Sequence, residues 1–506
     1  MSAGARAAEV EAIGMSMRFG RFVALDDVSI KVAAGSFHAL LGENGAGKST
    51  LVKCIMGYQR PSAGQLLVDG REAAIGDPRD AAALGLGMVY QHFTVAPSLT
   101  AAENLAIARR DAPGILDWAA ERARLADFMA RMPFKLPLDL PTRALSAGER
   151  QKLEILKQLY LGRRFLVLDE PTSVLTPDEA DEALGLVRAL TREGSLTALM
   201  ITHKFDEVSS FADEVTVLRR GRRVGSGKAS ELARDELARM MMGDQPLARP
   251  DDRAPVGGGA VLEVLGAEAP DRTGTKTIRI DDVAVREGEI VGVAGVSGNG
   301  QREFLEILAG QRALSAGEIR VRGAPYRATR AEMRRMAVRF LPEEPLRNAC
   351  APRMSVMENL AFRTFDVDAG GRRRFLLDRA AIRERARVLV ERFGVKAPSL
   401  DAPISTLSGG NVQRAALARE LDGDVALLIV ANPCFGLDFS AVAEVRARIV
   451  RARNRGAAVL LVSEDLDELL ELSDSIVVMR DGAIVHRTPA ADADVHEIGR
   501  HMAGAE

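Results

Sequence analysis

The chain has 506 residues, of which 47% are hydrophobic and 27% are charged. This composition excludes a wholly disordered chain, and the length corresponds to about three domains at ~150 residues each. The 68 Lys and Arg residues balance the 70 Asp and Glu residues, and aromatic residues make up only 4%. Binding to nucleic acid through bulk positive charge or base stacking is therefore disfavoured.

The sequence gives no sign of export or of insertion into a membrane. Its first residues, MSAGARAAEVEAIG, lack the basic and apolar regions of a signal peptide, and no apolar run approaches the ~20 residues of a membrane span. Cys54, Cys350 and Cys434 have neither disulfide nor metal-ligand spacing, and the six histidines are dispersed. We therefore expect a soluble, cytosolic, multidomain protein.

The chain contains two copies of one pattern. Four blocks recur in the same order, each 253 to 262 positions after its first occurrence, which indicates an internal repeat. We expect a first repeat at 1–245, a Pro- and Gly-rich linker at 246–257 and a second repeat at 258–506. The paired blocks are GENGAGKST (42–50) and GVSGNGQRE (295–303), LSAGERQ (145–151) and LSGGNVQ (407–413), LVLDEPTSVLT (166–176) and LIVANPCFGLD (428–438), and LMITHKFDEV (199–208) and LLVSEDLDEL (460–469).

Short apolar runs alternate with helical stretches inside each repeat. Runs at 37–42 and 165–170, with counterparts at 290–295 and 426–432, are continuously apolar, as is typical of strands buried on both faces of a sheet. The alternation predicts an α/β fold with a mostly parallel sheet in each repeat. The segments at 98–160 and 353–425 are mostly helical in pattern and predict a helical subdomain in each repeat.

The first glycine-rich block matches the P-loop motif in full, between a predicted buried strand and a predicted helix. Its glycines let backbone N–H groups surround a phosphate, and the helix N-terminus adds its positive end. Lys48 would reach the β- and γ-phosphate oxygens, and the Ser49 hydroxyl would ligate Mg²⁺. The predicted nucleotide-binding residues of this block are Gly42, Glu43, Asn44, Gly45, Ala46, Gly47, Lys48, Ser49 and Thr50.

An acidic pair ends a predicted strand of the same repeat. We expect Asp169 to hold Mg²⁺ and Glu170 to polarise the attacking water, the alternative being a helix cap before Pro171. Three further residues are candidates for this site. His203 ends the next apolar run and is a candidate for the γ-phosphate, while Gln91 could reach the metal and the water. Phe19 could stack on adenine. The alternatives are that His203 is a packed or surface histidine, that Gln91 is a surface-loop glutamine and that Phe19 is a core aromatic residue.

With these motifs in order, nearly the whole chain resembles a tandem ABC ATPase subunit of a bacterial importer. The most specific elements are the signatures LSAGERQ and LSGGNVQ, each shortly before an apolar strand. The resemblance implies two ABC-type P-loop domains that form an intrachain pseudo-dimer. It also implies that the signature of one repeat completes the ATP site of the other. Ser408, Gly409 and Gly410 would then act on the nucleotide held by the first repeat.

The second repeat keeps the glycines but loses the catalytic side chains. Lys48 and Ser49 are replaced by Gln301 and Arg302, and no aromatic residue lies between 250 and 303. The signature of the second repeat is intact, whereas the first signature has Ala147 in place of a glycine. We therefore expect one site that hydrolyses ATP and one degenerate site. The other losses replace Asp169 by Ala431, Glu170 by Asn432 and His203 by Glu464.

The resemblance implies the energy-coupling subunit of an importer, peripheral to the cytoplasmic face of the inner membrane. It would work with two transmembrane permease subunits and, indirectly, an extracytoplasmic solute-binding protein, and without nucleic acid. The GNGQRE loop and the SEDLDE segment resemble the nucleoside or purine branch, and simple-sugar importers are the alternative. A soluble ribosome-associated tandem ABC ATPase is a more distant alternative, because such proteins have two intact sites and a long charged linker.

Overall fold

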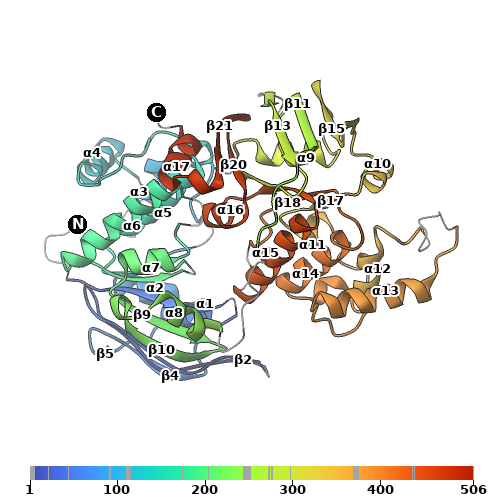
Figure 1. Cartoon of the computed structure of the whole chain (residues 1–506). Helices are drawn as coiled ribbons and strands as arrows, with labels where there is room; N and C mark the ends of the chain where they lie inside the picture. The colour runs from blue at the N-terminus through green and yellow to red at the C-terminus, as the bar shows by residue number, and fades with distance from the viewer. Residues whose placement is uncertain are drawn as a thin grey trace. The chain divides into compact units, whose positions relative to one another are not determined.

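The computed structural model describes residues 6–20, 22–43, 45–90, 93–109, 115–172, 175–202, 204–242, 252–271, 274, 277–296, 298–367, 375–435, 437 and 439–504. The chain divides into two compact units, Met1–Gln245 and Pro246–Glu506. They hold the first and the second repeat, drawn in blue to green and in yellow-green to red (Figure 1).

The first repeat has two sheets. A four-stranded antiparallel sheet has the order β2-β1-β4-β5. A six-stranded sheet has the order β10-β9-β3-β8-β7-β6 and is parallel except for β10. The strands are β1 (Val10–Phe19), β2 (Phe22–Val32), β3 (Phe37–Leu41), β4 (Ala63–Val68), β5 (Arg71–Glu72), β6 (Leu86–Val89), β7 (Phe165–Asp169), β8 (Thr197–Ile201), β9 (Glu214–Arg219) and β10 (Arg222–Lys228).

Helices cover this sheet and form a subdomain between β6 and β7. Local sequence sets where these helices start: Thr100 caps the start of α3 and Ser146 caps the start of α5, each in a reciprocal capping box with the glutamate three residues later. The helices are α1 (Lys48–Ile55), α2 (Pro78–Ala83), α3 (Ala101–Ala108), α4 (Trp118–Met129), α5 (Ala147–Tyr160), α6 (Pro177–Arg192), α7 (Phe205–Phe211) and α8 (Arg234–Met242), with short 3₁₀ turns η1 (Thr142–Ala144) and η2 (Ala229–Glu231).

The second repeat has the same plan. Its six-stranded sheet, β17-β18-β19-β14-β20-β21, is parallel except for β21, and its second sheet is antiparallel. The strands are β11 (Ala260–Pro270), β12 (Thr277–Ile280), β13 (Val283–Arg286), β14 (Ile290–Ala294), β15 (Ala316–Val321), β16 (Ala324–Pro325), β17 (Val338–Leu341), β18 (Leu427–Ala431), β19 (Ala458–Val462), β20 (Ser475–Arg480) and β21 (Ala483–Pro489).

The helices of the second repeat also correspond to those of the first, with α12 to α14 forming the subdomain. They are α9 (Gln301–Leu308), α10 (Arg330–Arg335), α11 (Pro345–Asn348), α12 (Val356–Ala361), α13 (Arg379–Arg392), α14 (Gly409–Glu420), α15 (Phe439–Asn454), α16 (Leu466–Leu472) and α17 (Val495–Ala503), with 3₁₀ turns η3 (Ile404–Thr406) and η4 (Ala490–Asp492). Two mostly parallel sheets with helical subdomains confirm the predicted fold class.

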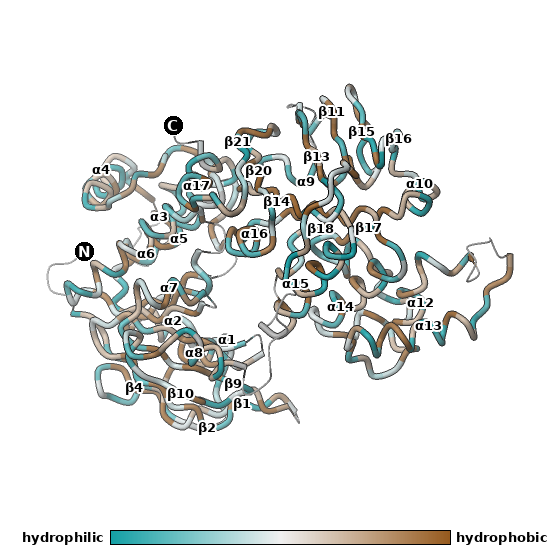
Figure 2. Tube along the Cα trace, in the orientation of Figure 1, coloured by the Kyte–Doolittle hydropathy of each residue, from teal (hydrophilic) through white to brown (hydrophobic). Residues whose placement is uncertain are grey.

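The central strands are buried on both faces, as their continuous apolar runs predict. In β7, Phe165 and Val167 pack into one core cluster, whereas Leu166 and Leu168 pack into another on the opposite face. The same alternation holds along β18. Strands such as β14 consist of apolar residues, as the colouring by hydropathy shows (Figure 2). Each catalytic motif follows one of these rigid strands, so the sheet fixes where the motif lies.

Candidate functional site

The glycine-rich loop of the first repeat joins β3 to α1 and requires glycine at two positions. A Cβ atom on Gly42 would lie 2.4 Å from the Leu218 carbonyl oxygen, and one on Gly47 would lie 2.8 Å from the Ala24 carbonyl oxygen. Gly47 also has φ +103°, a conformation that side chains disfavour, and it precedes the first helical residue, Lys48. Close packing against β2 and β9 therefore sets the shape of this loop.

Lys48 lies beneath the loop, with only 8% of its surface exposed. Its Nζ donates hydrogen bonds to the carbonyl oxygens of Gly42 at 2.5 Å and Glu43 at 3.1 Å. Burial lowers the pKa of the ammonium, while the charges of Glu170, Asp169 and Glu43 oppose that shift. The lysine and the strand-end carboxylates therefore belong to one electrostatic site.

A pocket of about 340 Å³ lies beside the loop and contains the two predicted metal ligands that the structure describes. Ser49, from the start of α1, and Asp169, from the end of β7, both line it. Gln59 lines the pocket too, and its Oε1 is buried with no hydrogen-bond partner among the described residues. A hydroxyl, a carboxylate and an unsatisfied amide oxygen form a hard donor set, which fits Mg²⁺.

Glu170 follows β7 in a left-handed backbone conformation, with φ +48°. Its backbone N–H donates to the Ile201 carbonyl oxygen of β8 at 2.9 Å. Such a conformation is costly for a glutamate and persists only where surrounding structure enforces it. Here the link to β8 fixes the turn that carries the predicted water-activating carboxylate.

The structure does not describe every predicted site residue, and it places others away from the pocket. Asn44, Gln91 and His203 lie outside the described residues, although Tyr90, directly before Gln91, lines the pocket. Phe19 ends β1 with 46% of its surface exposed, so it is not a core aromatic residue. Cys54 is buried on α1 and burial raises its pKa to about 11, as expected for a small packed side chain.

The second repeat builds the same loop around different side chains. Gln301 occupies the position of Lys48 with the same 8% exposure, and its Nε2 donates to the Val296 carbonyl oxygen at 3.2 Å. Arg302, at the position of Ser49, forms an ion pair with Glu306 at 3.2 Å. Asn432, at the position of Glu170, accepts a hydrogen bond from the Glu464 backbone N–H at 2.9 Å. In the second repeat, amide hydrogen bonds and an ion pair thus occupy the positions of the predicted catalytic and nucleotide-binding side chains of the first.

The two signature helices begin differently. The Ser146 hydroxyl accepts from the Glu149 backbone N–H at 3.1 Å, and the Glu149 carboxylate accepts from the Ser146 N–H at 2.7 Å. The Ser408 hydroxyl makes no such cap and accepts instead from the Asn411 side-chain amide at 2.8 Å. The start of α14 therefore lacks the carboxylate that caps α5.

Neither glycine of the second signature is needed for packing within its own repeat. A Cβ atom on Gly409 would meet nothing within 4 Å, and one on Gly410 would make only ordinary contact with Leu437. Neither residue has a positive φ. Within the described part of the second repeat, Gly409 therefore faces open space, and Gly410 has room for a larger side chain's Cβ atom.

Five residues that line the pocket were not predicted from the sequence: Lys53, Tyr58, Gln59, Met88 and Tyr90. The hydroxyls of Tyr58 and Tyr90 hydrogen-bond to each other, and burial raises the pKa of Tyr90 well above its ordinary value. No motif contains Tyr58 or Gln59, which follow α1. The only signal was at Tyr90, the neighbour of Gln91.

The fold and the site define a tandem P-loop ATPase, and comparison with known proteins gives its family. The profile of the ABC transporter family matches residues 25–173 and 279–434, once in each repeat. The chain belongs to the ABC transporter family of ATP-binding proteins. It is 40% identical to the glucose import ATP-binding protein TsgD13 of Haloferax volcanii, over 96% of this chain and 94% of that protein. It is 36% identical to the nucleoside import ATP-binding protein NupA of Lactococcus lactis, over 98% of both chains.

These relatives place the chain among ATPases that are coupled to import, as predicted. Among solved structures, the archaeal ribosome recycling factor aABCE1, crystallised with the ribosomal stalk protein aP1, matches with a TM-score of 0.63 and 19% identity, over 94% of this chain and 90% of that one. At that identity, the likeness shows the fold alone. Of the helices that the structure describes, none combines the length and hydrophobicity that crossing a bilayer requires.

Proposed function

We propose that the chain is the energy-coupling subunit of an importer and that one of its two nucleotide sites hydrolyses ATP. The observation that carries this proposal is the gathering of Lys48, Ser49, Asp169 and Glu170 at one loop and pocket of the first repeat. Residues 1–245 and 258–506 are the two nucleotide-binding domains, and 246–257 links them.

We assign each residue of the first site a role; the positions of Lys48, Ser49, Asp169 and Glu170 support theirs, and the roles of Gln91 and His203 follow from the family resemblance. Lys48 binds the β- and γ-phosphate oxygens, and the loop from Gly42 to Thr50 surrounds the phosphates with backbone N–H groups. Ser49 and Asp169, with Gln91, hold Mg²⁺, which when bound neutralises phosphate charge. Glu170 orients and polarises the attacking water, His203 contacts the γ-phosphate, and Phe19 offers an exposed ring to adenine.

In this proposal the signature of the second repeat completes the first site. Ser408, Gly409 and Gly410 bind the γ-phosphate through a hydroxyl and backbone N–H groups at the start of α14. Two observations support the assignment: neither glycine is required by packing in its own repeat, and the helix start carries Asn411 where the other signature carries Glu149. A phosphate there would meet no capping carboxylate.

We propose a nucleoside or purine as the solute, with a simple sugar as the second candidate. The 36% identity to a nucleoside import protein supports the first, and the 40% identity to a glucose import protein supports the second. The chain would dock at the cytoplasmic face of the membrane on two permease subunits, with a solute-binding protein outside and no nucleic-acid partner.

Uptake of labelled nucleosides and labelled sugars by a deletion strain tests the solute. We expect nucleoside uptake to fall to background and to return with the wild-type gene but not with Glu170→Gln. Loss of sugar uptake alone would assign the second candidate. If both uptakes were normal and the protein sedimented with ribosomes rather than with membranes, the importer proposal would be wrong.

A further inference from the structure

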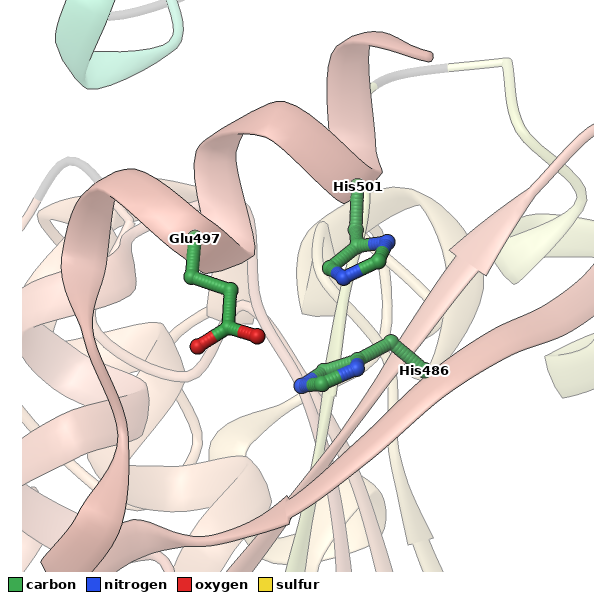
Figure 3. A group of neighbouring side chains, drawn as sticks. All are labelled: His486, Glu497 and His501. Carbon is green, nitrogen blue, oxygen red and sulfur yellow. The ribbon is translucent and has the colours of Figure 1, made fainter. Parts of the chain in front are cut away.

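Three potential metal ligands meet at the C-terminal end of the second repeat. His486 lies in β21, and Glu497 and His501 lie four residues apart on α17, so they share one face of that helix. Donor atoms of the three side chains all lie within 4.8 Å of one another. Figure 3 shows Glu497 beside the two imidazole rings. The histidines are dispersed in the sequence, but the fold brings this pair together.

The separation of the three side chains suits a small cation after modest side-chain rotation. The two imidazole rings stack, with centroids 4.2 Å apart and planes 12° from parallel. Tetrahedral ligands bound to zinc at ~2.1 Å lie about 3.4 Å from one another, so the donors need to approach by no more than roughly 1.4 Å. All three side chains are half-buried, which leaves room for that rotation and for water as a further ligand.

The backbone on either side of the cluster is firmly held. β21 pairs with β20, where His486 lies opposite Val478, and α17 buries Ile498 and Met502 in the core. The helix starts at Asp494, whose side chain accepts from the Glu497 backbone N–H at 2.8 Å. Ligands on two fixed elements form a site without the cost of ordering a loop.

The donor set defines the class of ion. Two imidazoles and one carboxylate suit Zn²⁺ and its first-row neighbours, whereas Mg²⁺ and Ca²⁺ prefer oxygen ligands alone. The pocket beside Ser49 and Asp169 has the opposite chemistry, with oxygen donors. The chain thus carries an oxygen-donor set that suits Mg²⁺ and a nitrogen-rich set that suits Zn²⁺ and related ions.

We propose that His486, Glu497 and His501 bind one transition-metal dication of the zinc class, which fastens α17 to β21. The bound ion would also stabilise the loop of the degenerate site. The Asn299 side chain of that loop donates to the Met502 carbonyl oxygen of α17 at 3.4 Å, and Arg480 of β20 donates to the His501 carbonyl oxygen at 3.4 Å. Metal occupancy and the degenerate loop are therefore linked through one helix.

Zinc binding to the untagged, metal-free full-length protein tests the proposal. In titrations against a chromophoric chelator with millimolar Mg²⁺ present, we expect one Zn²⁺ per chain at micromolar concentration or below. His486→Gln, Glu497→Gln and His501→Gln should each weaken binding at least tenfold. His496→Gln removes an exposed histidine from the same helix and is the matched control, which should bind as the wild type does.

Two further measurements separate ligation from a fold defect. Circular dichroism should show equal helix content in all four variants, and Co²⁺ bound in place of Zn²⁺ should give the visible absorption of a four- or five-coordinate site. That absorption should disappear in His501→Gln. No stoichiometric binding, or binding that survives all three ligand substitutions, would overturn the proposal, as would equal loss in His496→Gln.

Discussion

The two repeats share a backbone and differ in chemistry. The loop glycines have nearly equal φ values, +81° and +103° at Gly45 and Gly47 against +96° and +105° at Gly298 and Gly300. Lys48 and Gln301 are equally buried beneath these loops and both donate to loop carbonyl oxygens. The comparison shows that the two loops keep nearly the same backbone conformation although the side chains at the predicted catalytic positions differ.

The largest expected effect comes from removing the water-activating carboxylate. Glu170→Gln should lower ATP turnover of the assembled complex by ~10²-fold or more, because loss of a positioned general base has that cost. The matched variant is Asn432→Asp at the equivalent turn of the second repeat, which should leave turnover within twofold of wild type. Steady-state phosphate release measures both, and more than a tenth of wild-type activity in Glu170→Gln would refute the assignment.

The next prediction concerns the free energy of unfolding and the buried pair of His38 and Thr216, which the second repeat lacks. Burial lowers the pKa of His38 to about 4, and its Nε2 lies 2.9 Å from the Thr216 hydroxyl. At the equivalent positions the second repeat has Val291 and Val477. Because the folded pKa lies below the ordinary 6.5, the unfolded chain takes up a proton first, and stability present above pH 6.5 is lost as the pH falls toward 4.

Between pH 7.5 and 5, this single group should lower the free energy of unfolding of the first repeat by roughly 2 kcal/mol. His38→Val combined with Thr216→Val copies the second repeat and should remove that part of the pH dependence. Urea unfolding followed by circular dichroism at the two pH values measures the difference. An unchanged pH dependence in the double variant would show that His38 is not its source.

A smaller effect separates the two signatures. Ser408→Ala should lower turnover by about tenfold, since a hydrogen bond to a charged group contributes ~1.5 kcal/mol. Ser146→Ala in the first signature should change turnover far less, because the site that it would complete is degenerate. Nucleotide binding, followed with a fluorescent ATP analogue, should persist in both variants. Equal loss of turnover in the two would contradict the pairing of the second signature with the first site.

The last variant, Gln301→Lys, is expected to leave ATP turnover unchanged. Gln301→Lys restores the loop lysine of the second repeat but leaves Ala431 and Asn432 in place of the strand-end carboxylates. ATP turnover in Glu170→Gln should therefore not recover when Gln301→Lys is added. Any measurable rescue in phosphate release would mean that the second site needs only a lysine to work.

The sequence predicts best those parts of the molecule where a functional motif directly adjoins a strand or turn that has its own clear sequence pattern. The apolar run at 165–170 indicates a buried strand, and the glycines at 42–47 indicate a tight turn that forms a phosphate loop. Together they allow the fold class, and the proximity of Lys48, Ser49 and Asp169, to be predicted. Tyr58 and Tyr90 were not predicted, because their contact depends on how the end of α1 meets β6. His486 and His501 are fifteen positions apart, and only the turn between β21 and α17 brings their rings together.

The residue that follows β7, and its counterpart after β18, differ in how well they suit the turn that they form. Glu170 and Asn432 both hold left-handed backbone conformations, at φ +48° and +40°. Asparagine tolerates this conformation better than glutamate does. The first repeat thus retains a locally unfavourable residue where its carboxylate is useful, and the second has the residue that the turn itself prefers. The turn after β18 is therefore less strained at this position than the turn after β7.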